Sequence, residues 1–145
     1  MTREEIDQFP IPAITDEDQE FWKGVQEDKL LLQKCLDCNK LQYFPRPVCV
    51  NCFSMNLGWQ ECSGMGTLYS FTSIHMPIHP AVKKYVKETG IHPIFAKIDL
   101  DEGIRIFSEI IASKPDEIKI GVRVKVYFEE ARGTNFKLAK FRIMD

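Results

Sequence analysis

The segment from Cys35-Leu-Asp-Cys38 to Cys49-Val-Asn-Cys52 decides the fold of this chain. Its two Cys-x-x-Cys pairs stand ten residues apart, and each pair turns two sulfur atoms toward one point. Four thiolates gathered in this way form the tetrahedral ligand set of a closed, structural zinc site. The spacing therefore predicts that the four cysteines bind one Zn²⁺. Disulfides, unconnected core cysteines and a redox-active iron with the same ligands are the alternatives.

The residues after each pair predict two different turns. Asn39 follows the first pair, where a left-handed backbone is common, and asparagine tolerates that conformation. Phe53 occupies the same position after the second pair, and a bulky aromatic residue disfavours it. Nearby cations, Lys34, Lys40 and Arg46, are available to offset the negative charge of four thiolates around a divalent ion.

Length and composition are those of an ordinary globular protein. The 145 residues are 44% hydrophobic and 28% charged, which is enough for one domain, or two small ones, with a packed core. No apolar run approaches the ~20 residues of a membrane span, and Met1-Thr-Arg-Glu-Glu lacks the pattern of a signal peptide. Because four of the five cysteines have metal spacing, we expect a cytoplasmic location and no membrane association.

The net charge of −2 conceals an asymmetry. Residues 1–28 contain nine acidic and two basic side chains, whereas residues 29–145 contain seventeen basic and twelve acidic ones. One interpretation is a solvated acidic arm in front of an inert body, and the other is a body that binds an anion. Composition alone leaves both open.

Residues 1–29 are predicted to form an N-terminal arm with one helix. Pro10 and Pro12 favour an extended lead. Thr15-Asp-Glu-Asp18 then resembles a capping box, which predicts a helix over residues 16–27.

The apolar face of this helix consists of Phe21, Trp22 and Val25. Phe21 and Trp22 have two interpretations. They pack against the chain's own ribbon or sheet, or they anchor a partner protein, because tryptophan is frequent in interface hot spots.

Residues 30–62 are predicted to form a zinc ribbon, and residues 63–145 a five-stranded barrel, so the fold class is mainly β. The predicted barrel strands cover residues 67–76, 94–100, 104–112, 122–128 and 136–143. Asp101-Glu-Gly103 predicts a hairpin, and a phase slip near Ala139-Lys140 predicts a bulge in the last strand. Five antiparallel strands with a long insert after the first fit an OB-type barrel, with a split sandwich as the alternative.

These motifs, in this order, are similar to those of a known family. They are Phe21-Trp22-x-Gly24, Leu30 to Cys35, the two cysteine pairs around Pro45-Arg46-Pro47, Gly64-x-Gly66 with Tyr69-x-Phe71-Thr72, and Ile120-Gly121-x-x-Val124. From about residue 16 to its C-terminus, the chain resembles the acyl-CoA-associated family formerly called domain of unknown function thirty-five. That family joins a helical arm, a rubredoxin-like zinc ribbon and an OB-fold. The chain departs from it at Asn39 and Phe53, where relatives often have glycine.

The resemblance implies a non-catalytic partner of thiolase-type enzymes, including archaeal assemblies that couple a thiolase to hydroxymethylglutaryl-CoA synthase. Relatives also accompany aldolases and hydratases that act on CoA thioesters. A member of this family is expected to act as a scaffold that docks on such an enzyme and helps hold the CoA-linked intermediate. Structural zinc and CoA or acyl-CoA are the expected cofactor and ligand, and Phe21 and Trp22 are the candidate docking residues.

A CoA site requires cations for its phosphates beside a flat apolar surface. The candidate cations are Lys83, Lys84 and Lys87 in the insert, Arg132 in the last turn and Arg46 between two prolines. The insert, residues 77–93, is predicted to hold a short helix that ends at Gly90. A solvated lysine face is the competing interpretation of the insert, and for Arg46 it is an interaction with the ribbon's own charge.

The remaining reactive side chains predict no reaction. His75, His79 and His92 flank the insert without an accompanying acidic motif, so a second metal site or a catalytic dyad is only a minor alternative. Cys62 is interpreted as a small buried hydrophobic residue rather than a nucleophile.

Binding of single-stranded nucleic acid is the alternative function, because zinc ribbons and OB-folds often serve it. Tyr69, Phe71 and Tyr127 are the aromatic residues available to stack on bases. The negative net charge and the acidic arm disfavour this alternative.

Overall fold

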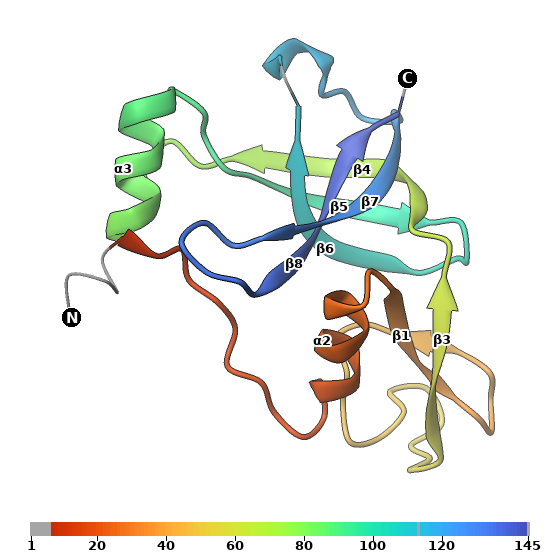
Figure 1. The fold of residues 1–145 in the computed structure, drawn as a ribbon. Helices are drawn as coiled ribbons and strands as arrows, with labels where there is room; N and C mark the ends of the chain where they lie inside the picture. Colours follow the sequence, from red (N-terminus) through yellow and green to blue (C-terminus); the bar gives the residue numbers. More distant parts are fainter. Residues whose placement is uncertain (1–6, 113, 145) are drawn as a thin grey trace.

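A closed five-stranded barrel and a three-stranded ribbon lie end to end in the computed structural model, which describes residues 7–112 and 114–144 (Figure 1). The first six residues of the predicted lead lie outside this range. The elements are α2 (Gln19–Gln26), β1 (Leu30–Cys35), β2 (Leu41–Gln42), β3 (Leu57–Cys62), β4 (Met65–Ser73), α3 (Pro80–Thr89), β5 (Ile94–Leu100), β6 (Arg105–Ile111), the 3-10 turn η1 (Pro115–Glu117), β7 (Arg123–Glu130) and β8 (Lys137–Ile143). None of the described helices is both long and apolar enough to cross a membrane.

The barrel has the strand order β4-β5-β6-β8-β7 and closes between β4 and β7, which is the OB-fold arrangement. The predicted mainly β fold with a five-stranded barrel is therefore confirmed. The hairpin between β5 and β6 turns at Gly103, whose N–H donates to the carbonyl of Leu100 at 2.9 Å. Insertion of α3 between β4 and β5 places a helix beside one end of the barrel, and α3 ends at Gly90 in a left-handed conformation.

The predicted bulge near Ala139-Lys140 is wrong, because β8 pairs with β7 in an unbroken register along its whole length. The phase slip in the sequence has another cause. Lys140, at 8% exposure, is buried next to Phe141, and its ammonium lies 3.5 and 3.2 Å from the carboxylates of two glutamates on neighbouring strands. The register shift lies instead in β4, between Leu68 and Ser70, where this strand pairs with β5.

The helix of the arm begins at Gln19, three residues later than predicted. The preceding residues, 16–18, form a turn. Only one half of the predicted capping box is present, in which the Asp18 carboxylate accepts the Thr15 N–H at 2.7 Å. The carboxylate therefore closes the turn before the helix, and no side chain caps the helix itself.

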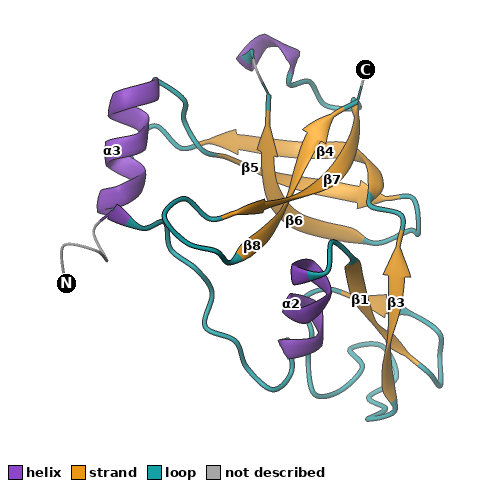
Figure 2. Cartoon of the chain, in the orientation of Figure 1, coloured by secondary structure: helices purple, strands orange, loops and turns teal. Residues whose placement is uncertain are grey.

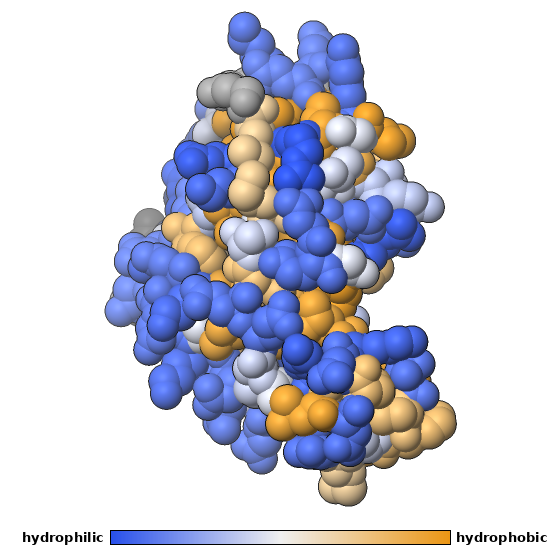
Figure 3. Space-filling view, turned by 90° about the vertical axis from the view of Figure 1, so that its right-hand side faces the viewer, coloured by the Kyte–Doolittle hydropathy of each residue, from blue (hydrophilic) through white to orange (hydrophobic). Residues whose placement is uncertain are grey.

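Helix α2 lies between β1 and the end of the barrel (Figure 2). Phe21 and Val25 face inward and join a single hydrophobic core with residues of the ribbon and the barrel. The Gln26 side-chain amide donates to the Lys137 carbonyl at 3.0 Å and accepts the Lys137 N–H at 2.9 Å, so it binds the helix to β8. Hydrophobic residues gather at the indentation between the barrel above and the ribbon below (Figure 3).

The described part of the lead runs along α3 and the loop between β7 and β8. The Phe9 N–H donates to the Arg132 carbonyl at 2.9 Å, and the Phe9 ring meets the Tyr85 ring edge-on at 5.5 Å. The Asp7 carboxylate lies 2.9 Å from the Lys84 ammonium. Residues 7–9 therefore connect helix α3 to the loop between β7 and β8, and we call this segment the strap.

Because Phe21 lies in the shared core with 4% exposure, the change Phe21→Ala is expected to lower the free energy of unfolding by about 3–5 kcal/mol. Urea denaturation followed by circular dichroism measures this loss. The matched control is Phe53→Ala, at a ring that is 77% exposed, with an expected change within about 0.5 kcal/mol. Equal effects of the two changes would contradict a core that includes the arm.

Candidate functional site

The sulfur atoms of the four paired cysteines converge on one point. Cys35 Sγ lies 3.6 Å from Cys52 Sγ, Cys38 Sγ lies 3.6 Å from Cys49 Sγ, and all four atoms lie within 4.8 Å of one another. A tetrahedron with Zn–S bonds of about 2.3 Å has sulfur–sulfur edges of about 3.8 Å. The arrangement therefore fits Zn²⁺, and four thiolates complete its coordination, as in a structural site.

The two cysteine turns have the same shape, so the prediction that they differ is wrong. Asn39 and Phe53 have φ angles of 63° and 62°. Their N–H groups donate to the carbonyls of Cys35 and Cys49, both at 2.9 Å. The Phe53 ring is 77% exposed, so its bulk meets no packed neighbour, and the metal-site geometry outweighs the preference of the residue.

Backbone N–H groups prepare two of the sulfur atoms for metal binding. The N–H of Cys38 is the main cause that lowers the pKa of Cys35, and the N–H of Cys52 is the main cause that lowers the pKa of Cys49 to about 6. Because metal binding requires thiolates, this lowering favours the metal-binding form at neutral pH.

Two buried glutamines hold the loop between the cysteine pairs. Gln33 and Gln42 are each 5% exposed. The Gln33 amide donates to the Arg46 carbonyl and accepts the Arg46 N–H, both at 2.9 Å. The Gln42 amide donates to Val48 O at 3.2 Å and accepts the Val50 N–H at 3.0 Å. This role was not predictable from the sequence, because a glutamine in a strand resembles an ordinary solvent-facing residue.

The other cysteine and the histidines lie apart from the metal centre. Cys62 is buried in the core, and burial, followed by the Glu102 charge, raises the pKa of its thiol to about 11. The His79 ring nitrogen Nδ1 accepts an N–H at the start of α3, and the rings of His75 and His92 lie with centroids 4.8 Å apart and their planes inclined at 43°. Among the described residues, the four paired cysteines are the one cluster of three or more His, Cys, Asp or Glu side chains that could hold a metal ion.

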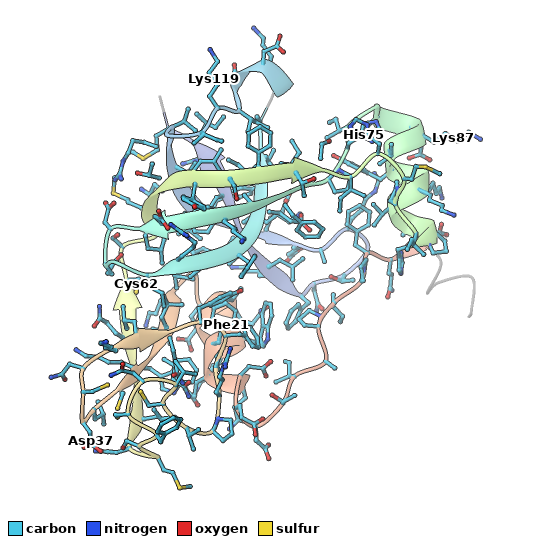
Figure 4. All side chains as sticks on the ribbon, turned by 180° about the vertical axis from the view of Figure 1, so that it is seen from behind. Phe21, Asp37, Cys62, His75, Lys87 and Lys119 are labelled. Atoms are coloured by element: carbon cyan, nitrogen blue, oxygen red, sulfur yellow. The ribbon has the colours of Figure 1, made fainter. Side chains whose placement is uncertain are left out.

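Lys83 and Lys87 line a hollow of about 410 Å³ beside α3. They stand one turn apart on the same face of the helix, and His75 also lines the hollow. The remaining lining residues, Met76, Pro77, Ile78 and Val86, are apolar. Figure 4 shows His75 and Lys87 at the same end of α3. We call this feature the cationic hollow.

Lys84 and Arg132 do not line the cationic hollow. The Lys84 ammonium bonds to Asp7, and this hydrogen bond raises the pKa of Lys84. Arg132 Nη2 lies 3.3 Å from the Glu88 carboxylate, and the Arg132 guanidinium lies 5.1 Å from the Tyr85 ring centroid. Both cations therefore belong to the contacts that surround the strap.

The other predicted site residues lie in the ribbon and the arm. The Arg46 guanidinium makes no ion pair with any described residue. Phe21 is buried, and Trp22 is half-buried, with its ring 5.5 Å from that of Phe136. The structure thus favours internal packing for Phe21, and the docking role of the pair stays a prediction.

A four-cysteine ribbon followed by a closed OB barrel defines a class of two-module zinc proteins. The family profile described as "ChsH2, rubredoxin-like zinc ribbon domain" matches residues 22–58. The profile described as "ChsH2, C-terminal OB-fold domain" matches residues 59–129. The chain belongs to this family, whose members are also designated DUF35.

Known relatives carry scaffold and enzyme-subunit names. The chain is 32% identical over 123 residues to a "Probable enoyl-CoA hydratase alpha subunit" of Thermomonospora curvata, which covers 84% of this chain but only 36% of that protein. It is 27% identical to a "DUF35 domain-containing scaffold protein" of Methanocaldococcus jannaschii, over 77% of this chain and 76% of that one. The chain thus spans about a third of the first relative and about three quarters of the second.

Among solved structures, a chain of the "Ltp2-ChsH2(DUF35) aldolase" is similar to this one with a TM-score of 0.78. The match has 29% sequence identity and covers 92% of this chain and 98% of that chain. The similarity therefore includes both the ribbon and the barrel.

Because all four ligands are needed to close the metal site, Cys49→Ser is expected to lose the one zinc ion per chain and the ordered ribbon. Metal analysis by mass spectrometry and a visible-region spectrum measure the bound metal, since zinc thiolates are colourless there. The control, Cys62→Ala, alters a cysteine outside the metal site and is expected to retain one zinc ion. Full zinc content in Cys49→Ser, or iron in the wild type, would contradict a structural zinc site.

Proposed function

We propose that this chain is a non-catalytic scaffold subunit that docks on a thiolase, or on a related enzyme acting on acyl-CoA thioesters, and helps hold the CoA-linked intermediate. The observation that carries the proposal is a similarity in sequence that covers most of both chains. The ribbon and the barrel together resemble the "DUF35 domain-containing scaffold protein" described above. The hydratase-subunit and aldolase names of other relatives support a partner that acts on CoA thioesters.

The chemistry of the metal centre supports a role without catalysis. Four thiolates leave the zinc ion no position for water or substrate, so the ion stabilises the ribbon and activates nothing. Cys62, the remaining cysteine, is buried with a raised pKa, which disfavours a nucleophilic thiolate. Under this proposal, the reaction belongs to the partner enzyme.

The cationic hollow is the proposed site for the phosphates of CoA. Lys83 and Lys87 both line this hollow, and charge-assisted hydrogen bonds from ammonium groups to phosphate oxygens are the strong kind. The apolar lining offers a surface for the uncharged part of the ligand. Lys84 is already neutralised by Asp7, and Arg132 by Glu88, so these two cations hold the strap and the helix rather than the ligand. Arg46 lies in the ribbon and remains a separate candidate.

Purification of the tagged full-length chain from its native host is expected to yield a stoichiometric acyl-CoA enzyme, identified by mass spectrometry. Trp22→Ala is expected to weaken this association about tenfold, because interface tryptophans are frequent hot spots. Phe136→Ala is the matched control, since it removes the internal contact of Trp22 but leaves the indole in place. The docking role of Trp22 fails if both variants weaken association equally. The scaffold role fails if the wild type brings down no such enzyme.

Titration calorimetry with CoA is expected to show weaker binding for the double change Lys83→Ala/Lys87→Ala. Each charge-assisted hydrogen bond contributes about 1.5–3 kcal/mol, so the loss should exceed about tenfold. Lys84→Ala serves as the control, because its ammonium bonds to Asp7, and it should change the affinity less than about threefold. A larger loss for the control than for the double variant would place the phosphates at the strap.

A further inference from the structure

The rim of the cationic hollow carries two strongly exposed apolar side chains. Met76 and Ile78 are 88% and 89% exposed, the highest values among the large hydrophobic side chains of the described residues. Pro77 lies between them, and all three line the hollow together with Val86 of α3. A single exposed apolar residue needs no explanation, but a group of them around a hollow with cations is typical of a surface that a ligand covers.

The positive charge of the hollow is not neutralised within the described chain. No acidic side chain is among the described residues that line it, and neither Lys83 nor Lys87 forms an ion pair with a described residue. Glu88 follows Lys87 in the sequence but pairs with Arg132 at 3.3 Å. The hollow therefore presents two lysine charges beside an apolar wall, which suits a ligand with a doubly charged anionic group next to an apolar one.

We infer that the cationic hollow selects the 3′-phosphoadenosine end of CoA. Lys83 and Lys87 bind the terminal 3′-phosphate, and the adenine ring covers Met76 and Ile78. This inference rests on the proposed function and deepens it, because it names the phosphate that is held and the class of thioester that is accepted. A thioester on the phosphopantetheine arm of a carrier protein lacks the nucleotide, so the chain should accept CoA thioesters and reject carrier-protein thioesters.

The two lysines favour the 3′-phosphate over the pyrophosphate. A phosphomonoester has three terminal oxygens and a charge of about −1.5 to −2 at neutral pH. Each phosphorus atom of the pyrophosphate bridge has only two terminal oxygens and one negative charge. Lys83 and Lys87 stand one turn apart in α3, so their Cβ atoms are about 5–6 Å from each other. Two flexible side chains with this spacing can close on a single phosphate group.

The apolar rim favours adenine as the neighbour of that phosphate. In CoA the 3′-phosphate and the base are attached to the same ribose, so a phosphate held by the lysines leaves the base within reach of the rim. Adenine offers a flat face to Met76 and Ile78, whereas the pyrophosphate has no such face. The hollow has a volume of about 410 Å³, near the lower end of the range of about 300–1,000 Å³ for ligand pockets. It therefore suits the nucleotide, and the pantetheine arm extends out of it.

The test is a ligand series measured by titration calorimetry on the full-length, zinc-loaded chain. Adenosine 3′,5′-bisphosphate is expected to bind within about threefold of CoA, because it contains the whole selected part. Dephospho-CoA lacks only the 3′-phosphate and is expected to bind at least about tenfold more weakly, because it loses the charge-assisted hydrogen bonds. Phosphopantetheine lacks the nucleotide and should show no binding at concentrations at which CoA saturates the chain.

The lysine variants test the phosphate contact. Lys83→Ala/Lys87→Ala is expected to bind CoA and dephospho-CoA within about threefold of each other, since the phosphate that distinguishes these ligands has lost its partners. Lys84→Ala is the matched control and should keep the preference of about tenfold for CoA, because the Lys84 ammonium bonds to Asp7. The zinc content and melting temperature of each variant show whether its fold is intact.

The rim variants test the adenine contact separately. Met76→Ser/Ile78→Ser is expected to weaken the binding of both CoA and dephospho-CoA at least about threefold, because both ligands contain the base. The preference for CoA should remain, since the lysines are unchanged. The control, Met55→Ser, removes a 79% exposed apolar residue of the ribbon and should leave both affinities within about twofold of the wild type.

Four outcomes overturn the inference. If the wild type binds CoA and dephospho-CoA equally and the double lysine variant weakens both, the lysines hold the pyrophosphate, and the proposed function stands. If the lysine variant keeps the preference for CoA, the 3′-phosphate binds elsewhere. If the wild type binds no CoA ligand, the proposed CoA site fails as well. If vesicles of phosphatidylglycerol and phosphatidylcholine in equal amounts bind the wild type but not the lysine variant, and CoA does not displace them, the hollow binds phospholipid head groups instead.

Discussion

Convergence of four sulfur atoms on one point is the constraint on which the rest of the molecule depends. It fixes the two cysteine turns, and with them the ends of β1 and β3, which pair along six residues. β3 leads directly into β4 through Gly64, whose φ of 75° and whose contact with Val126 leave no room for a side chain. A Cβ at Gly64 would lie 2.1 Å from the Val126 side chain. The cysteine cluster therefore fixes one end of the ribbon, and the close approach of Gly64 to Val126 constrains where the chain enters the barrel.

The parts of the fold that follow from local pattern were predictable from the sequence. Cysteine spacing identified the metal centre, and the alternation around Val124 identified a half-buried strand because one side of it faces the core. Failures arose where tertiary contacts outweigh local preference. Phe53 accepts a left-handed backbone because the metal site requires that turn, and Lys140 enters the barrel wall because two carboxylates neutralise its charge. Neither effect is visible in the neighbouring residues of the sequence.

The candidate ligand site was predictable only as a group of cations. In the sequence, Lys83, Lys84 and Lys87 form one basic cluster, but the helix divides them between two faces. Asp7 reaches Lys84 from far along the chain, and such a pairing leaves no periodic signal.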